Sequence, residues 1–342
     1  MRQLLLGVDG GNSKTDVLLL DDTGRVLSSV RGRTCAPLHL GLAGAIECLD
    51  ELIAETLAAA GLSRLALPLA VGVFALAGAD LPHEEAELLA AVSGRGWVRR
   101  ASVHNDAFAL LRSGTDRPWG VAVVCGAGIN CVGVGPDGGV ARFPALGGIS
   151  GDWGGGHDVG MAGLGAAVRS VDGRGPATLL AETVPAHFGR PDPVAVMTAM
   201  HVGELDERRV LELPPTVFAA ARAGDHVAGE IVLRLAGEVV ACAVAAIRRL
   251  GLTELDPDVV LGGSLLRAGL PLLDDAVRAG VLEVAPRAVI SHVAVAPVIG
   301  SALLALGDTD APPSAHEQLR RWGLTHDIGP ASATADPAVH QP

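Results

Sequence analysis

The feature that most constrains this chain is a short apolar run that closes in a glycine-rich turn and leads directly into a second apolar run. The first copy spans residues 4–20 and reads LLLGVDGGNSKTDVLLL. Two such runs joined by a glycine turn predict a β-hairpin whose turn leaves backbone N–H groups open to a ligand. N–H groups of this kind bind phosphate, and the carboxylate of Asp9 at the end of the first run can hold a metal ion. Taken alone, the stretch also fits an ordinary hairpin.

The same pattern returns later in the chain. Residues 120–125 form an apolar run, a glycine turn follows at 126–128, and residues 131–134 form the returning run. A third glycine turn, at 262–264, closes the apolar run 258–261. The repetition favours a phosphate-binding role over an ordinary hairpin. It predicts two domains of like topology that face each other across a cleft, each with one phosphate turn.

The order of the other elements predicts an α/β fold with a mixed sheet. A third strand at 25–30 precedes a helix over 42–57, and strands and helices then alternate up to residue 112. Asp106 follows the end of a strand, where open α/β sheets place ligand chemistry. A polar break at 115–118 predicts the domain boundary. The seven glycines in 147–160 predict a surface loop before a helix at 162–169, and the last dozen residues are expected to be disordered.

Composition narrows the possible functions. A chain of 342 residues with 49% apolar content can form two domains with a large core. A net charge of −12, 3% aromatic content and no tyrosine argue against nucleic acid as a partner. A small anion such as a nucleotide is still compatible, because backbone amides and a bound cation can hold it locally. Lys14 is the only lysine.

Cysteine usage and hydropathy indicate a cytoplasmic protein. The five cysteines are odd in number and contain no C-x-x-C pair, which predicts reduced thiols and neither a disulfide framework nor a zinc site. The N-terminus lacks the features of a signal peptide. The longest apolar run, 65–79, is interrupted by Pro68 and several glycines, so no membrane span is expected.

Taken together, these motifs resemble the superfamily of sugar kinases, heat-shock protein 70 and actin. Within it, residues 8–15, 76–80, 105–107, 126–131 and 151–152 are similar to the N-acetylglucosamine kinase and BadF/BadG/BcrA/BcrD ATPase family. The resemblance covers about residues 4–306. It implies two duplicated ribonuclease-H-like (actin-like ATPase) domains around a nucleotide cleft.

The resemblance also implies a division of the chain. Residues 1–115 would form the sugar-binding domain, with a helix at 297–307 packing back on it. Residues 116–296 would form the nucleotide-binding domain, and residues 308–342 a partly disordered tail.

The implied activity is that of an ATP-dependent sugar kinase. It would transfer the γ-phosphate of ATP to a hydroxyl of an amino sugar such as N-acetylglucosamine or glucosamine, with the 6-hydroxyl as acceptor. Asp106 would be the general base, and Asp9 would hold Mg²⁺. The remaining implied site residues bind nucleotide (Gly10, Gly11, Asn12, Ser13, Lys14, Thr15, Gly126, Ala127, Gly128, Gly262, Gly263, Ser264) or sugar (Asn105, Asp106, Asn130, Gly148, Asp152). A homodimer is expected.

Structural alternatives stand beside these roles. Asp106 and Asp152 can each cap the helix that follows, and Asn130 can supply a left-handed turn. Two departures from the family pattern concern the sugar: Trp153 replaces the usual Glu, and the loop 33–39 lacks an Asn. The alternative functions are an ATPase that activates a radical enzyme, which needs a pair of cluster-binding cysteines, and a non-catalytic sugar sensor.

Overall fold

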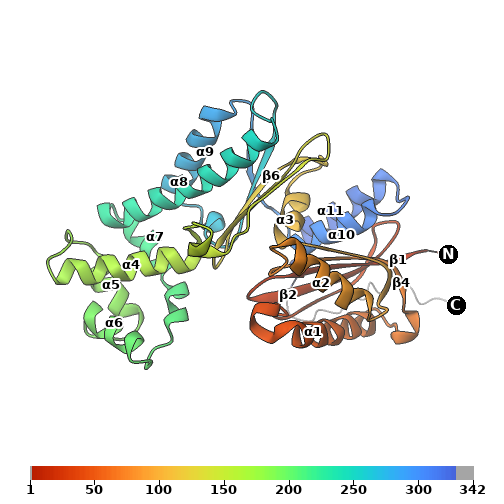
Figure 1. The fold of residues 1–342 in the computed structure, drawn as a ribbon, viewed down its shortest axis with the longest axis horizontal. Helices are drawn as coiled ribbons and strands as arrows, with labels where there is room; N and C mark the ends of the chain where they lie inside the picture. The colour runs from red at the N-terminus through yellow and green to blue at the C-terminus, as the bar shows by residue number, and fades with distance from the viewer. Residues whose placement is uncertain (1, 329–342) are drawn as a thin grey trace. The chain divides into compact units, whose positions relative to one another are not determined.

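The computed structural model describes residues 2–328, and the chain divides into two compact units (Figure 1). Unit 1 comprises Met1–Pro118 and Val293–Pro342, and unit 2 comprises Trp119–His292. The sequence expectation for the last dozen residues lies outside the described residues. Among residues 2–328, no helix combines the length and the apolar composition needed to cross a membrane.

Unit 1 is built on a five-stranded sheet with the order β3-β2-β1-β4-β5. Strands β1, β2 and β3 pair antiparallel, whereas β4 and β5 continue the sheet in parallel to β1. The bounds are β1 Leu4–Gly10, β2 Lys14–Asp21, β3 Val26–Arg33, β4 Leu69–Leu76 and β5 Val98–His104. The sheet is therefore mixed, as the order of elements predicts.

Two cores cover the two faces of this sheet, because apolar side chains alternate along β1 and β2. Leu6, Val8 and Val17 pack with α1 and α2, whereas Leu5 and Leu18 pack with α10 and α11. Figure 1 shows these two helix pairs on opposite sides of the sheet. The helices of unit 1 are α1 Pro37–Ala59, α2 Pro82–Ser93, α3 Asp106–Gly114, α10 Pro297–Gly307 and α11 Pro313–Thr325.

Unit 2 repeats this topology, with the strand order β10-β9-β6-β7-β8. Again three strands pair antiparallel and two continue in parallel. The strands are β6 Gly120–Cys125, β7 Ile129–Val134, β8 Val140–Arg142, β9 Asp258–Gly262 and β10 Val289–His292. The helices are α4 Gly155–Val171, α5 Leu180–His187, α6 Pro193–His201, α7 Pro214–Arg222, α8 His226–Arg249 and α9 Pro271–Val284. The two sheets confirm the α/β fold with a duplicated module.

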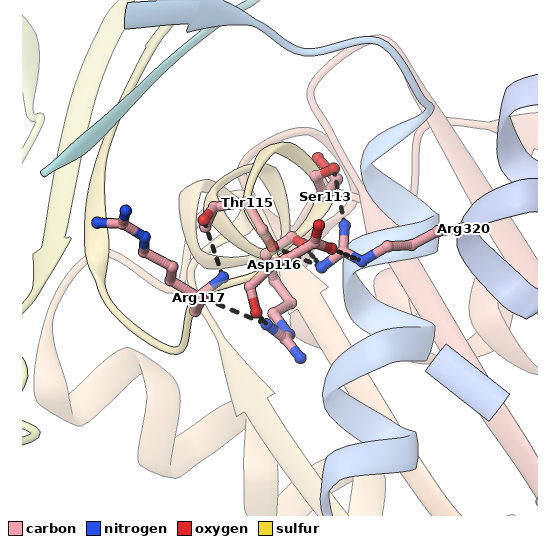
Figure 2. A network of polar contacts seen from close by, with 6 residues as sticks. Ser113, Thr115, Asp116, Arg117 and Arg320 are labelled. Atoms are coloured by element: carbon pink, nitrogen blue, oxygen red, sulfur yellow. Dashed lines mark hydrogen bonds and ion pairs between the residues drawn. The ribbon is translucent and has the colours of Figure 1, made fainter. Parts of the chain in front are cut away.

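Arg320 ties α11 to the end of α3 and to the segment that leads out of unit 1 (Figure 2). Its guanidinium donates to the carbonyl oxygens of Arg112, Ser113 and Thr115, and it also pairs with Asp116. These carbonyls belong to the last turn of α3, where no further helical N–H is available. The side chain of Arg320 therefore caps α3 from a neighbouring helix.

The expectation of reduced cysteines throughout is wrong for one pair. Cys35 and Cys48 form a disulfide, with their Cα atoms 5.5 Å apart. Cys35 follows β3, and Cys48 is a buried residue of α1. The packing of that helix against the sheet therefore brings the two sulfurs together. A disulfide formed by tertiary packing leaves no local spacing motif in the sequence. The number and spacing of the cysteines therefore did not predict it.

The expected surface loop 147–160 is also partly wrong. Helix α4 begins at Gly155, and Gly154, Gly155 and Gly156 are buried. A Cβ on Gly155 would lie 2.5 Å from the backbone of Gly128, and its φ is +78°. The glycines therefore serve a close backbone approach at a helix start, and residues 147–153 remain the exposed part of the loop.

Candidate active site

In unit 1, the hairpin between β1 and β2 presents the first glycine turn. Gly11 N donates to Lys14 O at 2.9 Å, and Ala77 N donates to Gly10 O at 2.7 Å, so β4 supports the turn from behind. Asn12 and Ser13 form its exposed tip. The predicted phosphate-binding backbone is therefore accessible here. The side chain of Thr15 is buried instead, and its Oγ1 accepts from Cys35 N at 2.9 Å.

Three charged residues form a row across the strands next to this turn. Asp9 on β1 is paired with Asp16 on β2, and Asp16 is paired with Arg31 on β3. The Asp16 carboxylate is fully buried and accepts from Arg31 Nε at 2.6 Å and Nη2 at 3.0 Å. Lys14 Nζ donates to the same carboxylate at 2.9 Å. Two cations thus balance Asp16, and among residues 2–328 no ion pair balances Asp9.

The electrostatics of Asp9 fit a bound cation. Burial raises the pKa of Asp9 well above its usual value, the charges of Asp106 and Asp16 raise it further, and the charges of Lys14 and Arg31 oppose this rise without cancelling it. Within residues 2–328, no three or more Asp, Glu, His or Cys side chains lie close enough together to hold a metal ion on their own. A Mg²⁺ ion commonly takes one or two carboxylates and completes its shell with waters and substrate phosphates. Asp9 suits that kind of site.

Asp106 begins α3, directly after β5. The predicted alternative, that Asp106 caps this helix, is wrong, because Asn105 is the N-cap residue and its Oδ1 accepts from Ala107 N at 3.0 Å. Burial raises the pKa of Asp106 to about 6, against the opposing effect of two backbone N–H groups. The Asp106 side chain is therefore available for proton transfer near neutral pH.

Asn105 has a structural role that the sequence did not reveal. Besides capping α3, its Nδ2 donates to Asp80 Oδ1 at 2.7 Å. The side chain is 2% exposed. These bonds fix the start of α3 and so fix where Asp106 lies. Its predicted contact with the sugar stays a prediction.

In unit 2, three glycine segments converge at the ends of β6 and β9. Gly156 N donates to Gly126 O at 2.8 Å, and His157 N donates to Ala127 O at 3.0 Å, so α4 holds the turn 126–128 from behind. Gly263 has φ +92°, and a Cβ there would lie 2.0 Å from Cys125 O. The predicted nucleotide-binding residues 126–128 and 262–264 are thus brought together within this unit.

The predicted sugar residues of unit 2 lie on β7 and on the loop before α4. Asn130 is in β7, opposite Val124. The alternative that it supplies a left-handed turn is wrong, because among residues 2–328 the only non-glycine residue with positive φ is Ala145. Gly148 is in an exposed 3₁₀ turn, Gly147–Ile149. Asp152 accepts from the Ser150 hydroxyl and does not cap α4, whose N-cap is Gly154. Their contact with sugar stays a prediction.

Several supporting residues escaped the sequence analysis. Asp16 and Arg31 balance charge beside the turn, and Thr34 Oγ1 donates to Gly11 O at 2.8 Å. The sequence signal that could have revealed Asp16 was a carboxylate within an otherwise apolar strand. Its partner depends on strand register, which the sequence does not show.

The cysteines left unpaired in residues 2–328 are poorly suited to bind a cluster. Cys125 and Cys131 are buried and Cys242 is half-buried, and burial raises the pKa of all three thiols. A metal cluster needs thiolates, which burial disfavours here.

Comparison with known proteins assigns the chain to a family. The model of the BadF/BadG/BcrA/BcrD ATPase family matches residues 6–305. The chain belongs to this ATPase family. Its fold is the actin-like ATPase fold with two domains. A crystal structure from Chromobacterium violaceum, of a protein provisionally assigned as an N-acetylglucosamine kinase, matches with a TM-score of 0.70. The match has 24% identity and covers 89% of this chain and 99% of that one.

Two curated relatives of this chain are sugar kinases. The N-acetyl-D-glucosamine kinase of Dictyostelium discoideum is 25% identical over 324 residues, which are 89% of this chain and 98% of the relative. The N-acetylmuramic acid/N-acetylglucosamine kinase of Clostridium acetobutylicum is 28% identical over 240 residues, which are 69% of this chain and 76% of the relative.

Proposed function

We propose that this protein is an ATP-dependent kinase of an amino sugar, with N-acetylglucosamine as the first candidate and the 6-hydroxyl as acceptor. The two curated relatives support the reaction class, since both are named as kinases of N-acetylated amino sugars. The protein would act in the cytoplasm as a homodimer, with ATP and Mg²⁺ as cofactors.

The proposed reaction uses Asp106 as the general base. Its carboxylate accepts the proton of the sugar hydroxyl, the hydroxyl oxygen attacks the γ-phosphorus, and the bond to ADP breaks. Asp9 would hold Mg²⁺, which neutralises phosphate charge when bound. The turns 10–13 and 126–128 would bind phosphate oxygens through the backbone N–H groups that they do not use internally, since Gly11 N and Gly126 N already donate to Lys14 O and Gly128 O. Phosphoryl transfer depends mainly on alignment and charge neutralisation.

The observation that carries the proposal is the position of Asp106. It begins α3 in the same unit as the Asp9 turn, close enough to raise the pKa of Asp9, and among residues 2–328 it has no cationic partner. A buried carboxylate with a purely structural role usually pairs with a cation or caps the N-terminus of a helix. Among the described residues Asp106 pairs with no cation, and the N-cap of α3 is Asn105, although backbone N–H groups at the start of the helix also bond the Asp106 carboxylate.

The test is phosphoryl transfer followed by ³¹P NMR. The protein is incubated with ATP, Mg²⁺ and N-acetylglucosamine, and the expected result is one sugar 6-phosphate for each ADP formed. Mannitol in place of the amino sugar is the control and should give neither product. ADP formed at the same rate with and without sugar would instead support the activator ATPase. Neither hydrolysis nor transfer, with tight sugar binding, would support the sensor.

A further inference from the structure

A pocket in unit 2 is lined by none of the predicted nucleotide or sugar residues. It lies between α4, the segment at Gly175–Pro176 and the first half of α8, and its volume is about 460 Å³. Figure 1 shows α4 and α8 on the same side of unit 2. This volume is in the range of small-molecule sites.

Arg234 on α8 has an unusual position at this pocket. Glu230 and Glu238 lie one helical turn before and after it, the spacing at which ion pairs form along a helix. Among residues 2–328 the guanidinium forms no ion pair with either of them, and it lies over the ring of Trp153 at 3.9 Å. Glu230 is near His226 instead, at 3.6 Å. Among the described residues the Arg234 guanidinium donates no hydrogen bond, so its N–H groups stay available to a ligand while its charge lies over the ring.

A second arginine lines the same pocket. Arg169 on α4 donates from Nη2 to Arg174 O at 2.8 Å, which fixes its position and uses one of its five N–H groups. The charged lining is thus two arginines and one glutamate, in a chain of net charge −12. A local excess of positive charge in an acidic protein favours an anion.

The wall between the arginines is apolar. On α4 it consists of Ala162, Gly165 and Ala166, and on α8 of Val227 and Ile231. A Cβ on Gly165 would meet no atom within 4 Å, so the space beside the helix is open. Small side chains on one wall and Trp153 at the end suit a planar apolar body.

We propose that this pocket is a second ligand site, for an organic anion with a planar apolar body, such as an aromatic carboxylate or sulfonate. The anionic group binds the edges of Arg234 and Arg169, and the planar body lies against α4. The proposal does not rest on the proposed kinase reaction, although Trp153 directly follows Asp152, one of the predicted sugar residues. The first turn of α4 also holds the turn 126–128, so the pocket and that turn share one helix.

The test is titration with 8-anilinonaphthalene-1-sulfonate, followed by calorimetry and by quenching of tryptophan fluorescence. We expect one probe per chain. N-phenyl-1-naphthylamine, which has the same rings without the sulfonate, should bind about tenfold more weakly, since one charge-assisted hydrogen bond contributes about 1.5 kcal/mol or more. Arg234→Met should weaken the anionic probe to the same degree. Arg248→Met, an exposed arginine on the same helix, is the matched control and should leave binding unchanged.

Three results would overturn the proposal. Equal affinity of the two probes, or of the wild type and Arg234→Met, would remove the role of the arginine. Displacement of the probe by saturating ATP would place it at the nucleotide site. Sedimentation that shows a dimer broken by Arg234→Met and by the probe would show that a second copy covers the pocket. If Arg234→Met does not fold, Ala166→Leu fills the pocket and should abolish binding of the probe.

Discussion

Asp9 lies directly opposite Asp16 on the antiparallel pair of β1 and β2, and both carboxylates are buried. Like charges in directly opposed positions destabilise a sheet. Arg31 and Lys14 offset the charge of Asp16, whereas Asp9 has no ion pair among residues 2–328. The fold therefore tolerates a buried acid that has no ion pair among the described residues beside the turn 10–13, where the charges of Lys14 and Arg31 offset only part of the rise in its pKa.

The Asp9→Asn variant tests this charge through stability. Because the pKa of Asp9 is raised in the folded state, the folded protein binds the proton more tightly than the unfolded chain, and stability falls as the pH rises from about 4 toward the folded pKa. Without Mg²⁺, the variant should therefore unfold at a higher temperature than the wild type at pH 7. The difference should vanish below about pH 4, where the carboxyl is protonated in both states.

The cation itself supplies the second arm of this experiment. Mg²⁺ with ATP should raise the unfolding temperature of the wild type more than that of Asp9→Asn, because the variant lacks the charged ligand. A lower unfolding temperature for Asp9→Asn at pH 7 without metal would mean that the Asp9 charge is already compensated.

Asp16 should be important for stability for the opposite reason. Asp16→Asn leaves Arg31 and Lys14 without their shared carboxylate, and loss of a buried partner costs about 3 kcal/mol. The matched control is Arg33→Gln, which breaks the exposed pair with Glu51 and should cost less than about 1 kcal/mol. Urea unfolding measures both, and equal costs would contradict the assigned role of the row.

The hairpins were predictable because their apolar runs and glycine turns are local. The strands of the two sheets were predictable for the same reason, since each strand is a local apolar run. The row of Asp9, Asp16 and Arg31 was not predictable, because it depends on the register of three strands. Equally, the Cys35–Cys48 disulfide and the contact of Gly155 with Gly128 depend on tertiary packing. At the start of α3, the alternative of Asp106 as the N-cap was wrong by one position. Asp and Asn are both favourable N-cap residues, and in the structure the N-cap is Asn105.

Gly263 should not tolerate a side chain. Gly263→Ala would place a Cβ 2.0 Å from Cys125 O, in addition to the strain of a residue at φ +92°. The free energy of unfolding should fall by well over the about 1–2 kcal/mol of left-handed strain alone. Gly269→Ala is the control, since Gly269 has φ +59° with no atom near its Cβ position, and it should cost only that strain. Similar values for the two variants would argue against close packing at the predicted nucleotide turn.

Arg320 should stabilise unit 1 through carbonyl oxygens and only weakly through its ion pair. Arg320→Met removes donors to Arg112 O, Ser113 O and Thr115 O and should cost about 2–3 kcal/mol. Asp116→Asn removes only the ion pair to a carboxylate that is 86% exposed, and should cost less than about 1 kcal/mol. Thermal unfolding compares them. A larger loss for Asp116→Asn would show that the ion pair dominates.

The proposed kinase reaction depends on the ionisation of Asp106, because a base must be ionised to accept a proton. With a pKa of about 6 in the free protein, kcat/KM for the sugar should rise tenfold per pH unit below that value and level off above it. Asp106→Asn removes the proton acceptor and keeps the shape of the side chain. The start of α3 should be unaffected, since Asn105 caps it.

The most direct measurement is therefore the turnover number of Asp106→Asn for phosphoryl transfer from ATP to N-acetylglucosamine, with ATP affinity measured on the same preparation. We expect kcat to fall by about 10²–10⁴-fold while the Kd for ATP is unchanged. A variant that phosphorylates the sugar at the wild-type rate would contradict the assignment of Asp106 as the base.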